Sequence, residues 1–152
     1  MTDEQRLALE AIVGRELTGE ERITISGLWL SSRNDVEIAA LLSRGRVKTK
    51  STPIGIGTCL AVMAPLGGNF LNTLEEIGAT DANVKWALKM IEQGTFDVGH
   101  PVTRAQLAAF AATTLSMADS VGALMAVAEV ADPIHYNIIS DALNIAEGRM
   151  TP

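Results

Sequence analysis

The sequence predicts an all-α protein with about seven or eight short helices and at most one minor pair of strands. Three observations support this prediction. Apolar residues recur at helical spacing along most of the 152-residue chain. Helix-capping signatures precede several of these segments, and glycine or proline follows most of them. Hydrophobic residues make up 47% of the chain and charged residues only 20%, a composition that argues against a disordered chain.

The first three predicted helices follow recognisable N-terminal caps. Thr2 and Thr18 each stand three residues before a Gln or Glu, which is the capping-box pattern, and Asn34 or Asp35 caps the third helix. These caps predict helices over residues 2–13, 20–31 and 36–43. Three consecutive β-branched residues, 23–25, are mildly unfavourable in a helix, so a short strand is the alternative there.

A basic segment, residues 44–50, separates the third predicted helix from the fourth. It holds four of the twelve basic residues of a chain whose net charge is −6. Its alternating pattern predicts an extended segment with most of its positive charges on one side. The plain interpretation is a solvated loop; the alternative is an arm that binds an acidic partner or nucleic acid. The candidate interface residues of this segment are Arg44, Arg46, Lys48 and Lys50.

Proline, asparagine and aspartate mark the starts of the next three predicted helices. Pro53 suits the first position of a buried helix, Asn69 caps a second helix, and Thr80 or Asp81 caps a third. The expected ranges are 54–64, 70–77 and 82–93. The first of these is shorter than the ~20 residues needed to span a membrane. It contains Cys59, the only cysteine, which is expected to be a buried thiol outside any disulfide.

A joint between helices is expected at residues 94–106. It contains two glycines, one proline and an apolar–polar alternation over residues 96–98, so neither neighbouring helical pattern continues through it. The exposed part of residues 96–101 is a second candidate interface. The residues chosen there are Phe96, Asp97 and His100.

The remaining sequence is predicted to be helical again. Apolar spacing predicts an αα-hairpin over residues 103–130, and the Asp132–Pro133 pair ends it. A last helix is expected over residues 141–147, followed by a loose tail at 149–152. A chain of this length suits one domain, which we expect to span residues 1–148 with the basic segment inserted in it.

No residue pattern indicates a catalytic, cofactor or metal site. His100 and His135 are far apart in sequence and lack further ligands at zinc spacing. Glu75 and Glu76 are adjacent on a predicted helix, so their side chains diverge by about 100° and do not meet at one bond. The glycines that follow Pro53 lack the third glycine and the lysine of a phosphate-binding loop. We therefore expect a non-enzymatic protein without cofactor or metal.

DNA binding is an alternative interpretation of residues 35–64. Residues 35–43 resemble the first part of a helix-turn-helix, and the basic segment follows them. The next predicted helix, however, carries no Arg, Lys, Asn or Gln to read base edges. A DNA-binding regulator or packaging protein is therefore the second hypothesis, and a small inhibitor of a host protein is the third.

Three stretches of the chain carry a family resemblance. Residues 33–46 read RNDVEIAALLSRGR, residues 86–106 read WALKMIEQGTFDVGHPVTRAQ, and residues 124–133 read LMAVAEVADP. Together they resemble small helical proteins encoded in the tail-region gene clusters of tailed bacteriophages. The resemblance implies a non-enzymatic virion or tail-assembly protein, located in the virion and assembled in the host cytoplasm.

The same resemblance implies the kind of partner. Other virion proteins or copies of the chain itself are expected to bind it; nucleic acid is a less favoured partner, and no membrane is expected. An acidic body with a basic segment can pair head to tail with further copies. Charge reversal at Arg46 and Lys48 is then expected to abolish assembly.

Overall fold

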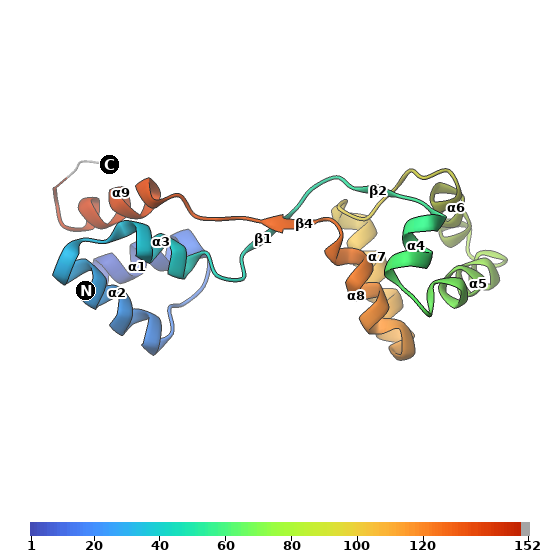
Figure 1. Cartoon of the computed structure of the whole chain (residues 1–152), viewed down its shortest axis with the longest axis horizontal. Coiled ribbons are helices and arrows are strands. Elements are labelled where there is room, and N and C mark those ends of the chain that lie inside the picture. The colour runs from blue at the N-terminus through green and yellow to red at the C-terminus, as the bar shows by residue number, and fades with distance from the viewer. Residues whose placement is uncertain (150–152) are drawn as a thin grey trace. The chain divides into compact units, whose positions relative to one another are not determined.

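The computed structural model describes residues 1–149, and this part of the chain is all-α, as the sequence predicted. It contains nine α-helices, one 3-10 turn and four short strands in two pairs, slightly more of each than expected. The chain folds into two compact units (Figure 1). Within the described residues, unit 1 comprises residues 1–47 and 131–149, and unit 2 comprises residues 48–130. Each unit has its own hydrophobic core.

Unit 1 is a group of four helices. They are α1 (Asp3–Val13), α2 (Gly19–Ser32), α3 (Asp35–Leu42) and α9 (Tyr136–Ala146). The last helix packs against α1 and α3, so it completes a core that the first 47 residues begin (Figure 1). The buried members of that core are Leu9, Leu17, Ile25, Trp29, Ile38, Ala39, Leu42, Ile134, Ile139 and Leu143.

The N-terminal caps of unit 1 are confirmed. Thr2 and Thr18 both form complete capping boxes, and residues 23–25 are helical, so the strand alternative there is wrong. The last helix begins at Tyr136 and not at residue 141, because His135 accepts a hydrogen bond from the amide of Asn137. Of the predicted loose tail, residue 149 is bound through its backbone and side chain, and residues 150–152 lie outside the described part.

Unit 2 contains the other five α-helices. They are α4 (Ile56–Val62), α5 (Gly67–Gly78), α6 (Ala82–Glu92), α7 (Pro101–Thr113) and α8 (Ala118–Ala126), with the 3-10 turn η1 (Leu115–Met117) between the last two. Its core gathers the side chains of Phe70, Ile91, Phe96, Val98, Val121 and Leu124. Cys59 is fully buried there, and this burial raises the pKa of its thiol, as expected for an inert core cysteine.

The two strand pairs account for most differences from the expected helix boundaries. β2 (Pro53–Ile54) pairs antiparallel with β3 (Phe96–Asp97), so Pro53 does not start a helix and α4 begins three residues later. β1 (Val47–Thr49) pairs with β4 (Glu129–Ala131), which ends α8 at Ala126 instead of residue 130. The extended form predicted for the basic segment is confirmed by β1.

Two further helix starts differ from the prediction. α5 begins at Gly67 and not after Asn69. Gly67 lies against α4, where a Cβ would be 2.7 Å from the carbonyl oxygen of Cys59, so a larger residue does not fit there. α7 begins at Pro101, with His100 as its N-cap, two residues before the predicted start. α7 and α8 pack against each other across η1, as predicted for the αα-hairpin, and their axes differ by 119°.

No single helix within residues 1–149 is long and apolar enough to cross a membrane. The bent pair formed by α7 and the η1–α8 segment has the length and composition of a membrane span, but nothing more points to one.

Candidate binding surfaces

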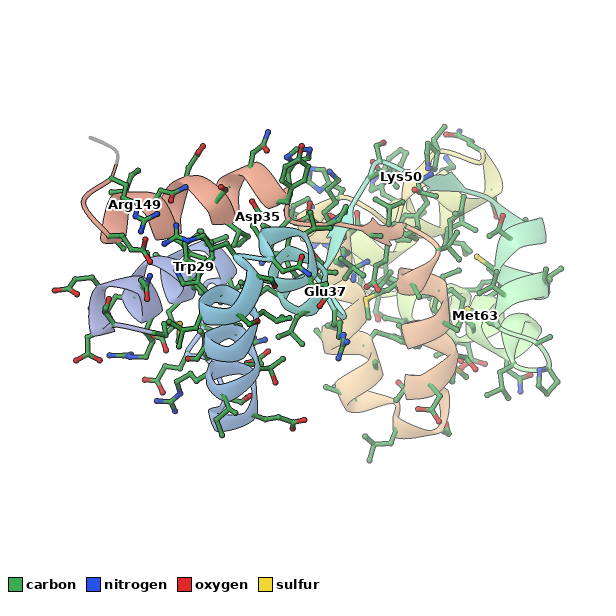
Figure 2. The ribbon with its side chains drawn as sticks, turned by 60° about the vertical axis from the view of Figure 1, so that its left-hand side comes forward. Trp29, Asp35, Glu37, Lys50, Met63 and Arg149 are labelled. Carbon is green, nitrogen blue, oxygen red and sulfur yellow. The ribbon has the colours of Figure 1, made fainter. Side chains whose placement is uncertain are left out.

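The basic segment is an ordered part of the fold. The Arg46 guanidinium donates to the carboxylate of Asp132 at 3.1 Å and to its backbone carbonyl at 3.3 Å. It also donates to the carbonyl of Val13 at 3.4 Å. Arg46 is therefore a structural residue of unit 1. The side chains of Arg44, Lys48 and Lys50 are exposed, and Lys50 is labelled in Figure 2.

Replacing Arg46 is expected to destabilise unit 1. Arg46→Ala removes three hydrogen bonds, two of them to backbone carbonyls, and should lower the free energy of unfolding by about 1–3 kcal/mol. Arg44→Ala, two residues away and exposed, should change it by no more than about 0.5 kcal/mol. Urea unfolding followed by circular dichroism measures both. Equal losses in the two variants would show that the contacts of Arg46 contribute nothing.

Asp97 ties the joint to the segment that precedes α4. Its carboxylate accepts the hydroxyl of Ser51 at 2.6 Å, the amide of Thr52 at 2.7 Å and the amide of Gly99 at 2.9 Å. These hydrogen bonds, that of Ser51 foremost, lower the pKa of Asp97. The Asp97 side chain is half-buried, and both of its carboxylate oxygens accept hydrogen bonds from within unit 2. Its structural role is to hold the segment before β2 against β3.

The other two residues predicted at the joint also have internal roles. Phe96 is only 5% exposed and belongs to the core of unit 2. The Nδ1 atom of His100 accepts the amide of Val102 at 3.3 Å and so caps α7. Within residues 1–149 no three His, Cys, Asp or Glu side chains are grouped to hold a metal ion. The proposed role of Phe96, Asp97 and His100 as interface residues stays a prediction.

The structure shows a pocket that the sequence did not predict. It lies between α5, α6 and α7 and has a volume of about 390 Å³. Its floor is apolar: Phe70 and Phe110 meet there edge to face, with ring centroids 5.5 Å apart, beside Phe96. The polar residues that line it are exposed and therefore form its rim; they are Asp81, Asn83, Gln106 and Thr113.

Small side chains leave room for this pocket. Ala87 on α6 and Ala109 on α7 line it where larger residues would fill the gap between the helices. Gln106, Ala109 and Thr113 follow one another at helical spacing, so one face of α7 runs along the opening. Apolar spacing predicts which side of each helix faces inward. It could not show that the helices stand far enough apart to leave a cavity.

A second exposed apolar surface lies on α2, and we call Ile23, Gly27 and Leu30 the α2 face. Ile23 and Leu30 are each 77% exposed, and their spacing of seven residues places them on one side of the helix. No charged residue occurs between positions 23 and 32. The hydroxyls of Ser26 and Ser31, and of the serine after it, donate to carbonyls four residues earlier. The α2 face is thus apolar, and its neighbouring hydroxyls already have partners.

Comparison with known proteins found no matching family model, no similar curated protein and no similar solved structure.

Proposed function

We propose that the chain is a non-enzymatic assembly protein that associates with further copies of itself through the α2 face. The observation that carries this proposal is the exposure of Ile23 and Leu30, at 77% each, on an uncharged helix face. An exposed stripe of this kind, unlike single scattered apolar residues, is typical of a protein–protein contact. The resemblance to phage tail-region proteins supplies the setting, a tail or related virion assembly.

Gly27 at the centre of the face favours another helix as the binding partner. A Cβ on Gly27 would meet no atom within 4 Å, so the packing of unit 1 does not require a glycine there. A glycine inside a helix costs about 0.5–1 kcal/mol relative to alanine. A glycine at the crossing point of two helices lets their backbones approach more closely, because no side chain separates them. Packing against a second helix would therefore explain the glycine at position 27.

The spacing of the α2 face makes it complementary to itself. If two copies of α2 run antiparallel about a twofold axis between Ser26 and Gly27, Ile23 of one copy lies level with Leu30 of the other. The opposed helix dipoles then place the acidic first turn of each copy beside the C-terminal end of the other, which is favourable. A twofold contact of this kind uses the same patch on both copies.

Substitutions on the α2 face should weaken self-association. Ile23→Glu and Leu30→Glu each place a charge inside the contact, on either side of its twofold axis, and full burial of one such apolar side chain is worth about 1.5–3 kcal/mol. The dimer dissociation constant is therefore expected to rise at least about tenfold in either variant. Sedimentation velocity over a concentration series, with native mass spectrometry, measures it.

Leu115→Glu is the matched control, because Leu115 is 80% exposed and lies in unit 2. It should associate like the unsubstituted chain. An unsubstituted chain that stays monomeric at every concentration would overturn the proposal, as would glutamate variants that associate normally.

The virion setting has its own test. Mass spectrometry of purified virions from the phage that encodes the chain should detect it, at a copy number that matches the symmetry of a tail component. Absence from the particle would contradict the setting but not self-association through the α2 face.

A further inference from the structure

We propose that the pocket of unit 2 binds a small amphipathic amine, whose alkyl or arylalkyl body enters the apolar floor and whose ammonium group lies at Asp81. This inference is independent of the assembly proposal, because it uses other residues in the other unit. It rests on the volume and lining of the pocket and on the one charge at its rim.

The pocket has the size and lining of a small-molecule site. Its volume of about 390 Å³ falls within the range of about 300–1,000 Å³ that is usual for such sites. Three phenylalanines, Phe70, Phe96 and Phe110, contribute to its floor, and the polar groups are confined to the rim. This division matches a ligand with an apolar body and one polar end.

The residues at the rim of the pocket determine which charge is favoured on the polar end of the ligand. Among the described residues that line the pocket, Asp81 is the only charged one, and none is Lys, Arg or His. Its Oδ1 accepts the amides of Asn83 and Val84, at 2.8 and 3.3 Å, and so caps α6. No hydrogen bond within residues 1–149 uses its Oδ2, which is therefore available to a cation.

The same geometry disfavours an anionic ligand. The amide groups of Asn83 and Val84 are the donors that the start of α6 would otherwise offer to an anion, and Asp81 already occupies them. An added carboxylate would meet the charge of Asp81 without a compensating cation. The side-chain amides of Asn83 and Gln106 have no hydrogen bond within residues 1–149, and their carbonyl oxygens can accept hydrogen bonds from an ammonium or hydroxyl group at the rim.

Three probes with the same alkyl chain test this selectivity: hexylammonium, hexanol and hexanoate, titrated into the full chain and followed by NMR. Hexylammonium should bind about 2- to 5-fold more tightly than hexanol, the gain usual for an exposed ion pair, and hexanoate should bind most weakly. Asp81→Asn should remove the preference for the amine, and asparagine is as good an N-cap as aspartate. Asp119→Asn, the same change of charge on α8 outside the pocket, should leave the preference unchanged.

A second pair of variants tests the location. Ala109→Phe should fill the pocket and weaken all three probes at least tenfold, whereas Ala112→Phe, exposed on α7 outside the lining, should not. Circular dichroism confirms that each variant is folded. The proposal fails if no probe binds, if hexanoate binds as tightly as hexylammonium, or if Asp119→Asn acts like Asp81→Asn. Normal self-association in that case would leave the assembly proposal intact.

Discussion

Gly99→Ala is expected to destabilise unit 2 by about 3 kcal/mol or more. Gly99 is buried, and a Cβ on it would lie only 2.6 Å from the carbonyl carbon of Lys50 and closer still to its carbonyl oxygen. Side-chain Cβ atoms do not approach other atoms this closely, so the two backbone segments would have to move apart.

Moving the two backbone segments apart costs free energy, because it breaks the hydrogen bonds around Gly99. Asp97 binds the amides of both Thr52 and Gly99, at 2.7 and 2.9 Å. The amide of Val98 donates to the carbonyl of Thr52 at 3.2 Å. Separating residue 99 from Lys50 therefore breaks the contacts that hold β2 to β3, and the cost of the clash adds to the cost of these lost hydrogen bonds.

Gly122→Ala is the matched control for this prediction. Gly122 lies inside α8, and a Cβ on it would meet no atom within 4 Å, so alanine should stabilise unit 2 by up to about 1 kcal/mol. Hydrogen exchange of the α7 amides, read beside those of α9 in unit 1, measures the effect and assigns it to a unit. Protection of α7 that is unchanged in Gly99→Ala would contradict the close approach of the two segments.

Local signals explain why much of the helical fold could be predicted. The caps at Thr2, Thr18 and Asp81 act on amides two or three residues away, so the residues that decide them are adjacent in the sequence. Gly14 and Gly94, which directly follow predicted helices, both have positive φ angles, which few other residues adopt without strain. Features of this kind depend little on the rest of the chain.

The differences arise where distant segments meet. Pro53 has the sequence context of a helix start, but its backbone pairs with Asp97, and nothing near Pro53 reveals that partner. The candidate surfaces follow the same rule. The exposed stripe on α2 could be read from helical spacing once Ile25 and Trp29 were known to face inward, but the pocket depends on the distance between α6 and α7.

Glu147 is expected to be the most sensitive polar side chain of unit 1. Its Oε1 accepts the indole N–H of Trp29 at 2.7 Å and the side-chain amide of Gln5 at 2.9 Å. Its Oε2 binds Arg33 at 3.0 Å and Arg149 at 2.8 Å. Figure 2 labels two of these donors, Trp29 and Arg149, beside α9. One carboxylate thus links α1, α2 and the end of α9.

The charge of Glu147 matters because its partners are donors. The hydrogen bond from Trp29, followed by the hydrogen bond from Arg33 and the positive charges of Arg149 and Arg33, lowers the pKa of Glu147 below its ordinary value of 4.5. A carboxyl whose pKa is lower in the folded state contributes stability above its unfolded pKa, and that contribution is lost as the pH falls through the folded pKa. The stability of unit 1 should therefore decrease from about pH 4.5 downward.

Two substitutions separate the charge of Glu147 from its hydrogen bonds. Glu147→Gln keeps one acceptor oxygen but no charge, so it should destabilise unit 1 at pH 7 and show a smaller further loss in acid. Glu147→Ala should be worse at pH 7, because Gln5 is only 2% exposed and an unsatisfied buried amide costs about 1–3 kcal/mol. Urea unfolding at a series of pH values, read through the α9 amides by hydrogen exchange, measures both.

The loss of stability at acidic pH should be smaller in Glu147→Gln than in the unsubstituted chain, but it should not vanish. Unit 1 has other carboxylates whose pKa is lowered in the folded state. Arg15 and the amide of Thr18 lower the pKa of Glu21 to about 2, and the amide of Leu17 lowers that of Glu10. Glu4→Gln, an exposed change on α1, should leave the whole pH profile unchanged. A Glu147→Gln profile parallel to that of the unsubstituted chain would mean that Trp29 and Arg33 bind the neutral and charged carboxyl equally well, so that α9 is held by its apolar contacts alone.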